Sequence, residues 1–358
     1  MRGRWLVVLL TAAALVVVPL AVSARPVSRS TVTAEALAER VQRSASIGWS
    51  GSVQTAGTLG LPDSDSFANL ADLLGESNSL RVWWRGSDDW RVDRIRSTGE
   101  TDLFRQRGVS VRWVFESETA TVAPVSTIRL PDASDLLPPS LARSMLQGVR
   151  ADELSRLPDR RIAGIEAPGL RLSPNQTGST IGHVDVWADE ATGLPLRVEV
   201  FGRGEQRPVL TTAVQDLDLS TPPEATTDFL APAGITVNYE DSVDVAASAN
   251  AFAPFDLPAA LAGLTARSGE DPGAVGVYGR GPTTLIAMPL RGQVLRPIRA
   301  QLRDSTAAEE TGVGTLAPVG PISLLATSGR GGRGGFLLAG TVDSQTLERA
   351  ATELLATQ

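Results

Sequence analysis

The chain has 358 residues and a net charge of -7, and 42% of its residues are hydrophobic, which is enough for ordinary cores in two domains. It has no cysteine, which excludes disulfides, cysteine-ligated zinc, iron–sulfur clusters, thiol catalysis and an N-terminal acylated cysteine. All 33 basic residues are arginine, and the excess of negative charge disfavours a nucleic-acid partner.

The N-terminus has the pattern of a leader. Arg2 and Arg4 precede an apolar run from Trp5 to Ala24, which ends in the small residues Val22-Ser23-Ala24. The run suits a signal peptide that is cleaved after Ala24, and it also approaches the roughly 20 residues that span a bilayer. Both interpretations, a secreted chain or one anchored in the cytoplasmic membrane, place the remainder outside the cytoplasm, because the arginines stay inside.

Three elements are predicted before the centre of the chain. The pattern over 34–46 predicts an amphipathic helix capped by Thr33, and a strand over 47–58 places Trp49 and Val53 on one face. A second short helix is predicted over 64–76, which is either an additional core helix or a movable lid over an apolar cavity. Its apolar positions follow helical spacing and are the lid candidates: Phe67, Leu70 and Leu74.

A tryptophan-rich stretch from Leu80 to Glu118 is predicted to form three or four antiparallel strands. Val82 and Trp84 alternate with polar or exposed positions, and Val111, Trp113 and Phe115 do the same further on. The turns between them are rich in glycine, serine and aspartate. The alternation predicts one apolar face with large aromatic side chains and one arginine-rich, solvated face.

The later part of the chain supplies a cover for that apolar face and further strands. A helix over 136–148 carries Leu141 and Met145, and two strands joined by a tight turn carry Val186 on one strand and Leu196 and Val198 on the other. An Ala/Ser-rich acidic stretch, 238–253, is predicted to be a linker. The remainder, 254–358, alternates strands and helices and predicts a small α+β domain.

Catalytic and cofactor-binding patterns are missing from the sequence. The single histidine, His183, lies in a predicted strand, and no GxSxG, GxGxxG or GxxxxGK[ST] motif occurs. The glycine-rich segment 328–335 is interpreted as a hairpin loop. We therefore expect a protein that is not an enzyme and that has no cofactor and no metal site.

The order of the motifs GWSGSVQT, LRVWWRGSDDWRVD, GETDLFRQRGVSVRWVFESETATV and DVWADEATGLPLRVEVFGRG resembles the LolA/LolB-type lipoprotein-carrier superfamily. It is most similar in style to extracytoplasmic actinobacterial LolA-like members, to LppX/LprG-like lipid binders and to RseB/MucB-type regulators. The resemblance covers 34–237. The C-terminal segments PFDLPAALAGL and FLLAGTVDSQTLERAATELL resemble a small module of RseB-like proteins.

This resemblance implies an α+β fold, a half-open antiparallel β-barrel wrapped around helices, in 25–237, followed by the small C-terminal domain. It also implies an apolar cavity between the sheet and the helices that takes acyl chains. The candidate lining residues are Trp49, Val53, Val82, Trp84, Val111, Trp113, Phe115, Leu141, Met145, Val186, Leu196 and Val198. The family's lid arginine matches no position here, and the missing acylated cysteine departs from the lipid-anchored members.

Three functions remain open at this point. The first is a carrier or sensor of a lipid or of a lipoprotein acyl chain in the bacterial envelope. The second is an RseB/MucB-like regulator that acts on an anti-sigma factor or another membrane protein through the C-terminal domain. The third is a structural envelope protein whose cavity is fully packed.

Overall fold

The computed structural model describes residues 29–60, 68–125, 129–239, 257–267, 275–305, 307–328 and 334–356. The predicted leader, the lid candidate Phe67 and most of the predicted linker lie outside these ranges. Within them, no helix combines the length and the hydrophobicity that crossing a bilayer requires.

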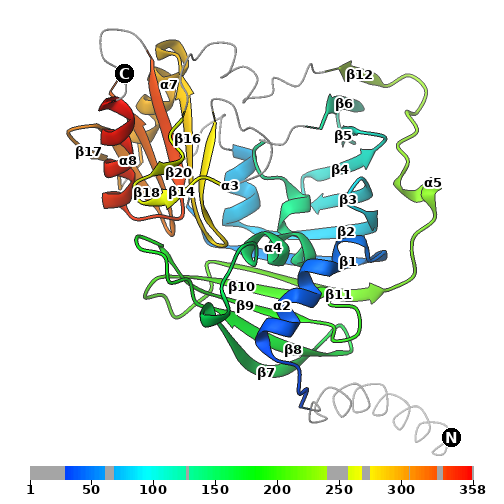
Figure 1. The fold of residues 1–358 in the computed structure, drawn as a ribbon. Helices are drawn as coiled ribbons and strands as arrows, with labels where there is room; N and C mark the ends of the chain where they lie inside the picture. Colours follow the sequence, from blue (N-terminus) through cyan, green and yellow to red (C-terminus); the bar gives the residue numbers. More distant parts are fainter. Residues whose placement is uncertain are drawn as a thin grey trace, which may run out of the picture.

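The larger of the two main sheets, here called the first sheet, has twelve strands in the order β12-β6-β5-β4-β3-β2-β1-β11-β10-β9-β8-β7. All neighbouring strands pair in antiparallel fashion except β12 and β6, which are parallel. The sheet does not close, and β12 and β7 are its two edges (Figure 1). Its strands are β1 (Trp49–Gly57), β2 (Ser77–Gly86), β3 (Asp89–Arg96), β4 (Gly99–Gln106), β5 (Val109–Val114), β6 (Thr119–Pro124), β7 (Leu154–Ile162), β8 (Ile165–Leu172), β9 (Ile181–Ala188), β10 (Pro195–Gly202), β11 (Leu210–Asp218) and β12 (Thr236–Tyr239).

Short helices accompany this sheet. They are α2 (Ala34–Arg43), α3 (Ala68–Gly75), α4 (Pro138–Met145) and α5 (Glu224–Thr227), with single 3₁₀ turns at η1 (Ser44–Ser46), η2 (Ala133–Leu136) and η3 (Ala151–Glu153). The hydroxyl of Thr33 accepts a hydrogen bond from the backbone N–H of Ala36 at 3.2 Å, as the predicted cap requires. Strand β7 follows η3 directly, at Leu154.

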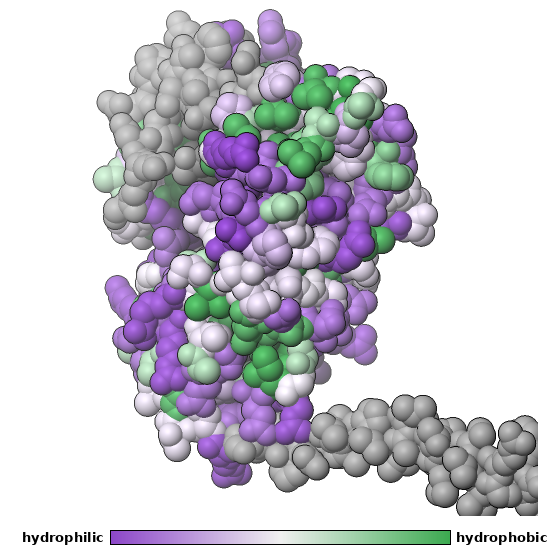
Figure 2. All heavy atoms as spheres, turned by 90° about the vertical axis from the view of Figure 1, so that its right-hand side faces the viewer, coloured by the Kyte–Doolittle hydropathy of each residue, from purple (hydrophilic) through white to green (hydrophobic). Residues whose placement is uncertain are grey.

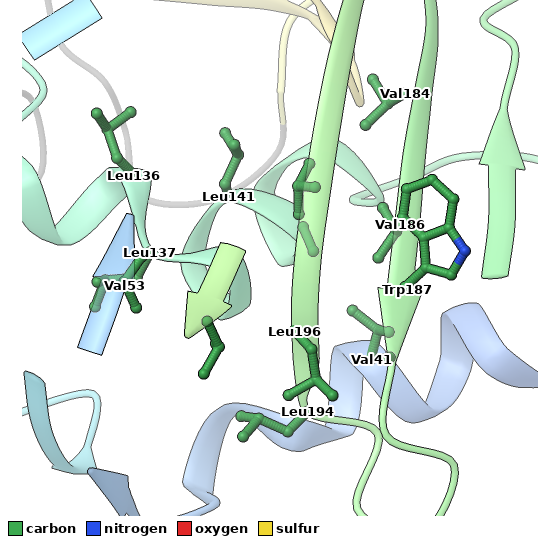
Figure 3. Packing of buried hydrophobic residues seen from close by; sticks show 14 of the residues in the cluster. Val41, Val53, Leu136, Leu137, Leu141, Val184, Val186, Trp187, Leu194 and Leu196 are labelled. Atoms are coloured by element: carbon green, nitrogen blue, oxygen red, sulfur yellow. The ribbon is translucent and has the colours of Figure 1, made fainter. Parts of the chain in front are cut away.

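Helices α2 and α4 pack on one face of the first sheet, which we call the inner face (Figure 1). Helix α2 contacts β7 and β8, and α4 contacts β10 and β11. Figure 3 shows side chains from α2, from the η2–α4 segment and from β9 and β10 filling the space between helices and strands. One continuous hydrophobic core results, and it extends from α2 and α4 to β1–β3.

The opposite, outer face of β4–β6 carries a second, smaller core. Directly paired residues of antiparallel strands share a face, and Trp113 pairs with Asp102, which pairs with Asp93, which pairs with Arg81. Arg81 alternates with Val82 along β2, so Trp113 lies on the face opposite Val82. The prediction that Val111 and Trp113 share a face with Val82 and Trp84 is therefore wrong.

Side chains from the part of the chain that follows α5 cover this outer core. Phe229 lies 5.2 Å from Phe104 and 6.0 Å from Trp113 between ring centroids. Phe115 is not part of either core, because β5 ends at Val114 and Phe115 is 63% exposed in the following turn. Because β5 ends before Phe115, the prediction that Phe115 continues the apolar face is wrong.

The part of the chain that covers the outer core ends with strand β12, which includes Asn238 and Tyr239. Both residues were predicted to begin the linker, so the strand extends two residues into the predicted linker.

Seen from the side of β2–β6, the surface mixes hydrophobic areas with hydrophilic side chains (Figure 2).

A second sheet of six strands forms a separate layer with its own cores (Figure 1). Its order is β15-β16-β20-β19-β18-β17, and α8 (Ser344–Ala356) packs against one core while α7 (Gly292–Arg303) packs against the other. Leu338 and Leu337 are neighbours in β20 and belong to different cores, so the two helices cover opposite faces. The strands are β15 (Gly276–Arg280), β16 (Thr283–Leu290), β17 (Glu309–Glu310), β18 (Gly314–Val319), β19 (Ile322–Thr327) and β20 (Gly335–Gly340), with a separate ribbon of β13 (Ala260–Leu261) and β14 (Leu264–Thr265).

The two neighbouring aromatic positions on either side of the end of β5 test the outer core. Trp113→Ala removes a side chain that is 9% exposed, and we expect it to lower the free energy of unfolding by about 3–5 kcal/mol. Phe115→Ala, the matched control, should change it by less than about 0.5 kcal/mol, because the side chain is mostly in water. Urea unfolding of both variants measures the difference. Equal losses would contradict the assignment of Phe115 to the surface.

Candidate functional site

Most of the predicted cavity residues lie together on or over the inner face. Trp49, Val53, Val82 and Trp84 come from β1 and β2, and all four are buried in the main core. The others in this core are Val186, Leu196, Val198 and Leu141, with Met145 packed against it at the end of α4. Val111, Trp113 and Phe115 lie outside this group.

The inner face also contains Trp90 and Val92 of β3, which sequence reasoning did not include. They pair directly with Trp84 and Val82 across the β2–β3 hairpin. The rings of Trp84 and Trp90 stack at 5.8 Å between centroids with an interplanar angle of 4°. The signal was present in the turn Gly86–Asp89, because a short hairpin there places these two tryptophans opposite each other.

Helix α3 connects β1 to β2 along the chain and packs on this core. Leu73 and Leu74 are buried in the core and Leu70 packs against it, so two of the predicted lid residues contact the inner face. The backbone N–H of Leu59 donates to the carbonyl oxygen of Leu74 at 3.2 Å, and Arg96 Nη1 pairs with Asp72 Oδ2 at 2.8 Å. The helix is thus held by one apolar side and a few polar contacts.

Buried Asn78 connects α3 to the sheet. Its Nδ2 donates to Thr55 Oγ1 at 3.2 Å and to the carbonyl oxygen of Leu73 at 3.1 Å, and its Oδ1 accepts from Arg94 Nε at 2.7 Å. Burial, and next the charge of Arg96, lower the pKa of Arg94. One amide side chain therefore supplies hydrogen bonds both to the end of α3 and to the buried guanidinium of Arg94.

The inner face becomes polar on β3 and β4. Arg94 and Arg105 both project from it, and Arg105 lies over the Trp90 ring at 5.8 Å from the centroid. Among the described residues, Arg94 Nη2 and two nitrogens of Arg105, Nε and Nη1, are buried without a hydrogen-bond partner. Buried donors of this kind favour a ligand that has a polar or anionic end.

Three carboxylates gather on the outer face of β3 and β4. Asp93, Glu100 and Asp102 place carboxylate oxygens within 4.8 Å of one another, which is a spacing that a metal ion could use. Arginines already pair with them: Arg91 Nε lies 2.6 Å from Asp93 Oδ1, and Arg81 Nη2 lies 2.5 Å from Glu100 Oε1. The cluster is therefore a neutralised charge network rather than an open metal centre.

Asp102 has the most perturbed acidity in this cluster. Burial, and next the charge of Asp93, raise the pKa of Asp102 to about 7 against the opposing effect of Arg91. Asp93 is its direct cross-strand partner, and burial also raises the pKa of Asp93. Two buried carboxylates that face each other cannot both ionise cheaply, so one proton is retained near neutral pH.

His183 lies on β9 with its ring stacked on Phe201 at 4.1 Å between centroids. Burial, and next the charge of Arg171, lower the pKa of His183. A neutral ring that stacks on an aromatic partner contributes to packing.

Two clefts lie away from the inner-face core. One, of about 410 Å³, runs along Ser30–Glu35 and Leu154–Arg156. The other, of about 770 Å³, lies between the first and second sheets and is lined mainly by polar side chains. Neither is lined by the predicted cavity residues.

No protein-family model matches the chain. A search of curated proteins gives no match either. Among solved structures, the chain is similar to MucB in the MucA/MucB complex of Pseudomonas aeruginosa, with 17% identity over 89% of this chain and 96% of that one and a TM-score of 0.49.

A LolA superfamily protein from Nitrosomonas europaea is also similar, with 15% identity over 56% of this chain and 99% of that one and a TM-score of 0.24. A conserved protein from Thermus thermophilus matches at 12% identity over 58% of this chain and 99% of that one, with a TM-score of 0.37. The two kinds of protein that the sequence resembles, LolA-type and MucB-type, both occur among these structural neighbours. At these identities and TM-scores the likeness says nothing of function.

The Asp93–Asp102 pair predicts how stability depends on pH. Because the pKa of Asp102 is higher in the folded than in the unfolded chain, the folded protein binds more protons between about pH 4 and pH 7. The stability that the protonated Asp102 carboxyl contributes is therefore full below about pH 4 and is lost as the pH rises through about 7. In Asp102→Asn this fall should become shallower, as measured by urea unfolding from pH 4 to pH 8. An unchanged slope would show that Asp102 ionises normally in the folded protein.

Proposed function

We propose that the chain is a non-enzymatic extracytoplasmic carrier or sensor that binds the acyl chain of a lipid or lipoprotein against the inner face. One observation carries the proposal: the apolar inner face of a large open sheet is covered by short helices instead of by a second sheet. In this proposal residues 25–237 form a half-open barrel around these helices. An acyl chain that replaced a helix there would gain about 0.8 kcal/mol per buried CH₂.

Helix α3 is the cover that we propose to move. It contacts the core through one face only, and β1 and β2 on either side of it pair directly with each other. Those strands therefore keep their register when α3 leaves. The buried, unpartnered guanidinium nitrogens of Arg94 and Arg105 at the margin of the core would meet the polar end of the ligand.

The location outside the cytoplasm rests on the arginines and apolar run at the N-terminus. In this proposal the leader is either removed or keeps the protein on the cytoplasmic membrane. The lipid partner then reaches the inner face from the membrane or from another envelope protein.

A reversible lock on α3 tests this proposal. The chain has no cysteine, so Leu59→Cys with Leu74→Cys can form only one intramolecular disulfide, between two buried positions whose backbones are hydrogen-bonded. We expect the oxidised double variant to lose binding of a fluorescent fatty-acid probe and the reduced form to regain it. Leu59→Cys alone is the control, and its binding should not respond to oxidation.

Mass spectrometry of lipids extracted from the unmodified full chain, purified from native membranes, completes the test. A protein that carries no lipid and ignores the probe would refute acyl-chain binding and favour a packed structural protein. Probe binding that the disulfide does not affect would leave the carrier function and remove the role of α3.

A second candidate is a regulatory protein that contacts a membrane protein through the C-terminal part. The observation that favours it is the second sheet, which has two cores of its own and two flanking helices that an acyl-chain site does not need. Pull-downs with and without residues 254–358 separate the two: identical partner sets would count against regulation through this part.

A further inference from the structure

The cleft between the two sheets has features that acyl-chain binding does not use. It has a volume of about 770 Å³, within the usual range for small-molecule sites. Its walls come from the end of the α4 region, the turn before β9, the β13–β14 ribbon, the end of β15 and the first turns of α8. These segments belong to both sheets.

The walls are held together by specific contacts. Ser179 forms an isolated antiparallel bridge with Val342, and the backbone N–H of Asp343 donates to the carbonyl oxygen of Gly178 at 2.8 Å. On the other side, Arg280 of β15 pairs with the carboxylate of Glu153. The cleft is therefore preformed by backbone and side-chain contacts that join the sheets.

Glu153 is the main polar link across the cleft. It is 3% exposed, and its carboxylate accepts hydrogen bonds from Arg280, from the backbone N–H of Asn175 at 2.9 Å and from that of Arg150 at 2.8 Å. Burial opposes its ionisation, but these hydrogen bonds outweigh burial and hold the pKa of Glu153 below its ordinary value. Its negative charge is thus already used within the wall.

Positive charge dominates the lining of the cleft among the described residues. Arg150, Arg267, Arg280 and Arg349 line it, and Arg280 is the one that Glu153 neutralises. The lining carboxylate of Asp343 is directed to the start of α8, where it accepts from the N–H of Thr346 at 2.9 Å and from its hydroxyl at 2.7 Å. This excess of positive charge contrasts with the net charge of -7 of the whole chain.

Arg267 is positioned by uncharged groups. Its Nε donates to the carbonyl oxygen of Gly279 at 3.0 Å, and its Nη2 donates to the carbonyl oxygen of Gly281 at 3.0 Å and to Thr284 Oγ1 at 2.5 Å. No carboxylate of the described residues pairs with it, and burial lowers its pKa. Within the described part of the chain, Arg267 is thus oriented without being neutralised, which is how a cation that meets an anion is held.

We propose that this cleft binds a ligand that carries a phosphate group. The planar guanidinium forks of arginine match phosphate oxygens, and the four arginines come from four separate segments around one compact space. That arrangement surrounds a small anion rather than following an extended chain. The polar lining also distinguishes this cleft from the apolar inner face.

Titration of the full chain tests the proposal with two phosphate sources. Glycerol 3-phosphate represents a soluble phosphate ester, and phosphatidylcholine vesicles that contain phosphatidic acid represent a lipid headgroup. We expect at least one of them to bind, measured by calorimetry for the ester and by vesicle co-sedimentation for the lipid. Binding of either kind supports the proposal and identifies the source.

Two exposed arginines provide the variant. Arg150→Glu with Arg349→Glu reverses two lining charges without removing a hydrogen bond of the described walls, and it should weaken binding by about tenfold or more. The matched control is Arg296→Glu on α7, which covers the opposite face of the second sheet. It should bind like the unmodified protein, and the melting temperature of each variant reports its folding.

Three results would overturn the proposal. The first is that neither phosphate probe binds. The second is that the cleft and control variants weaken binding equally, which indicates non-specific attraction. The third is that a hexaglutamate peptide binds more tightly than either phosphate probe and in the same arginine-dependent way, because the cleft would then serve an acidic peptide. None of these results bears on acyl-chain binding at the inner face.

Discussion

A single open sheet with one large apolar face needs a cover, and the rest of this structure depends on how that face is covered. A closed barrel would bury the face against itself, and a sandwich would bury it against a second sheet. Here α2, α3 and α4, with the 3₁₀ turns before and after them, lie against it. The cover consists of short pieces that are not themselves strands of the sheet.

The pieces of this cover are not equally fastened. Helix α2 places four residues in the core and has a capped start, and α4 reaches into the core from a proline-started turn. Helix α3 relies on a leucine face, the ion pair of Asp72 with Arg96 and the amide of Asn78. This is the piece of the cover that we propose to move.

Polarity separates the two parts of the molecule that we assign to ligands. The inner face is mainly apolar on β1 and β2 and bears arginine at Arg94 of β3 and Arg105 of β4. The cleft between the sheets is lined mainly by polar side chains, with an excess of arginine among the described residues. Charged groups cannot enter the former without loss of hydration, and apolar chains gain little in the latter, so the two regions select different chemistry.

The sequence by itself located those strands, turns and helices whose signals are strong and local. Period-two alternation located β2, β5 and β10, and Thr33 with the Leu37–Val41 spacing predicted α2, because these signals are local. Only the tertiary structure decided which face of the sheet each strand shows. Both faces of β4 carry an apolar residue, because Leu103 lies on the inner face and Phe104 on the outer face. The pattern of β4 therefore does not indicate which face is the inner one. The outer cover of Trp113 comes from Phe229, more than a hundred residues later, and no local signal connects the two. The cleft arginines likewise meet only when the second sheet docks on the first.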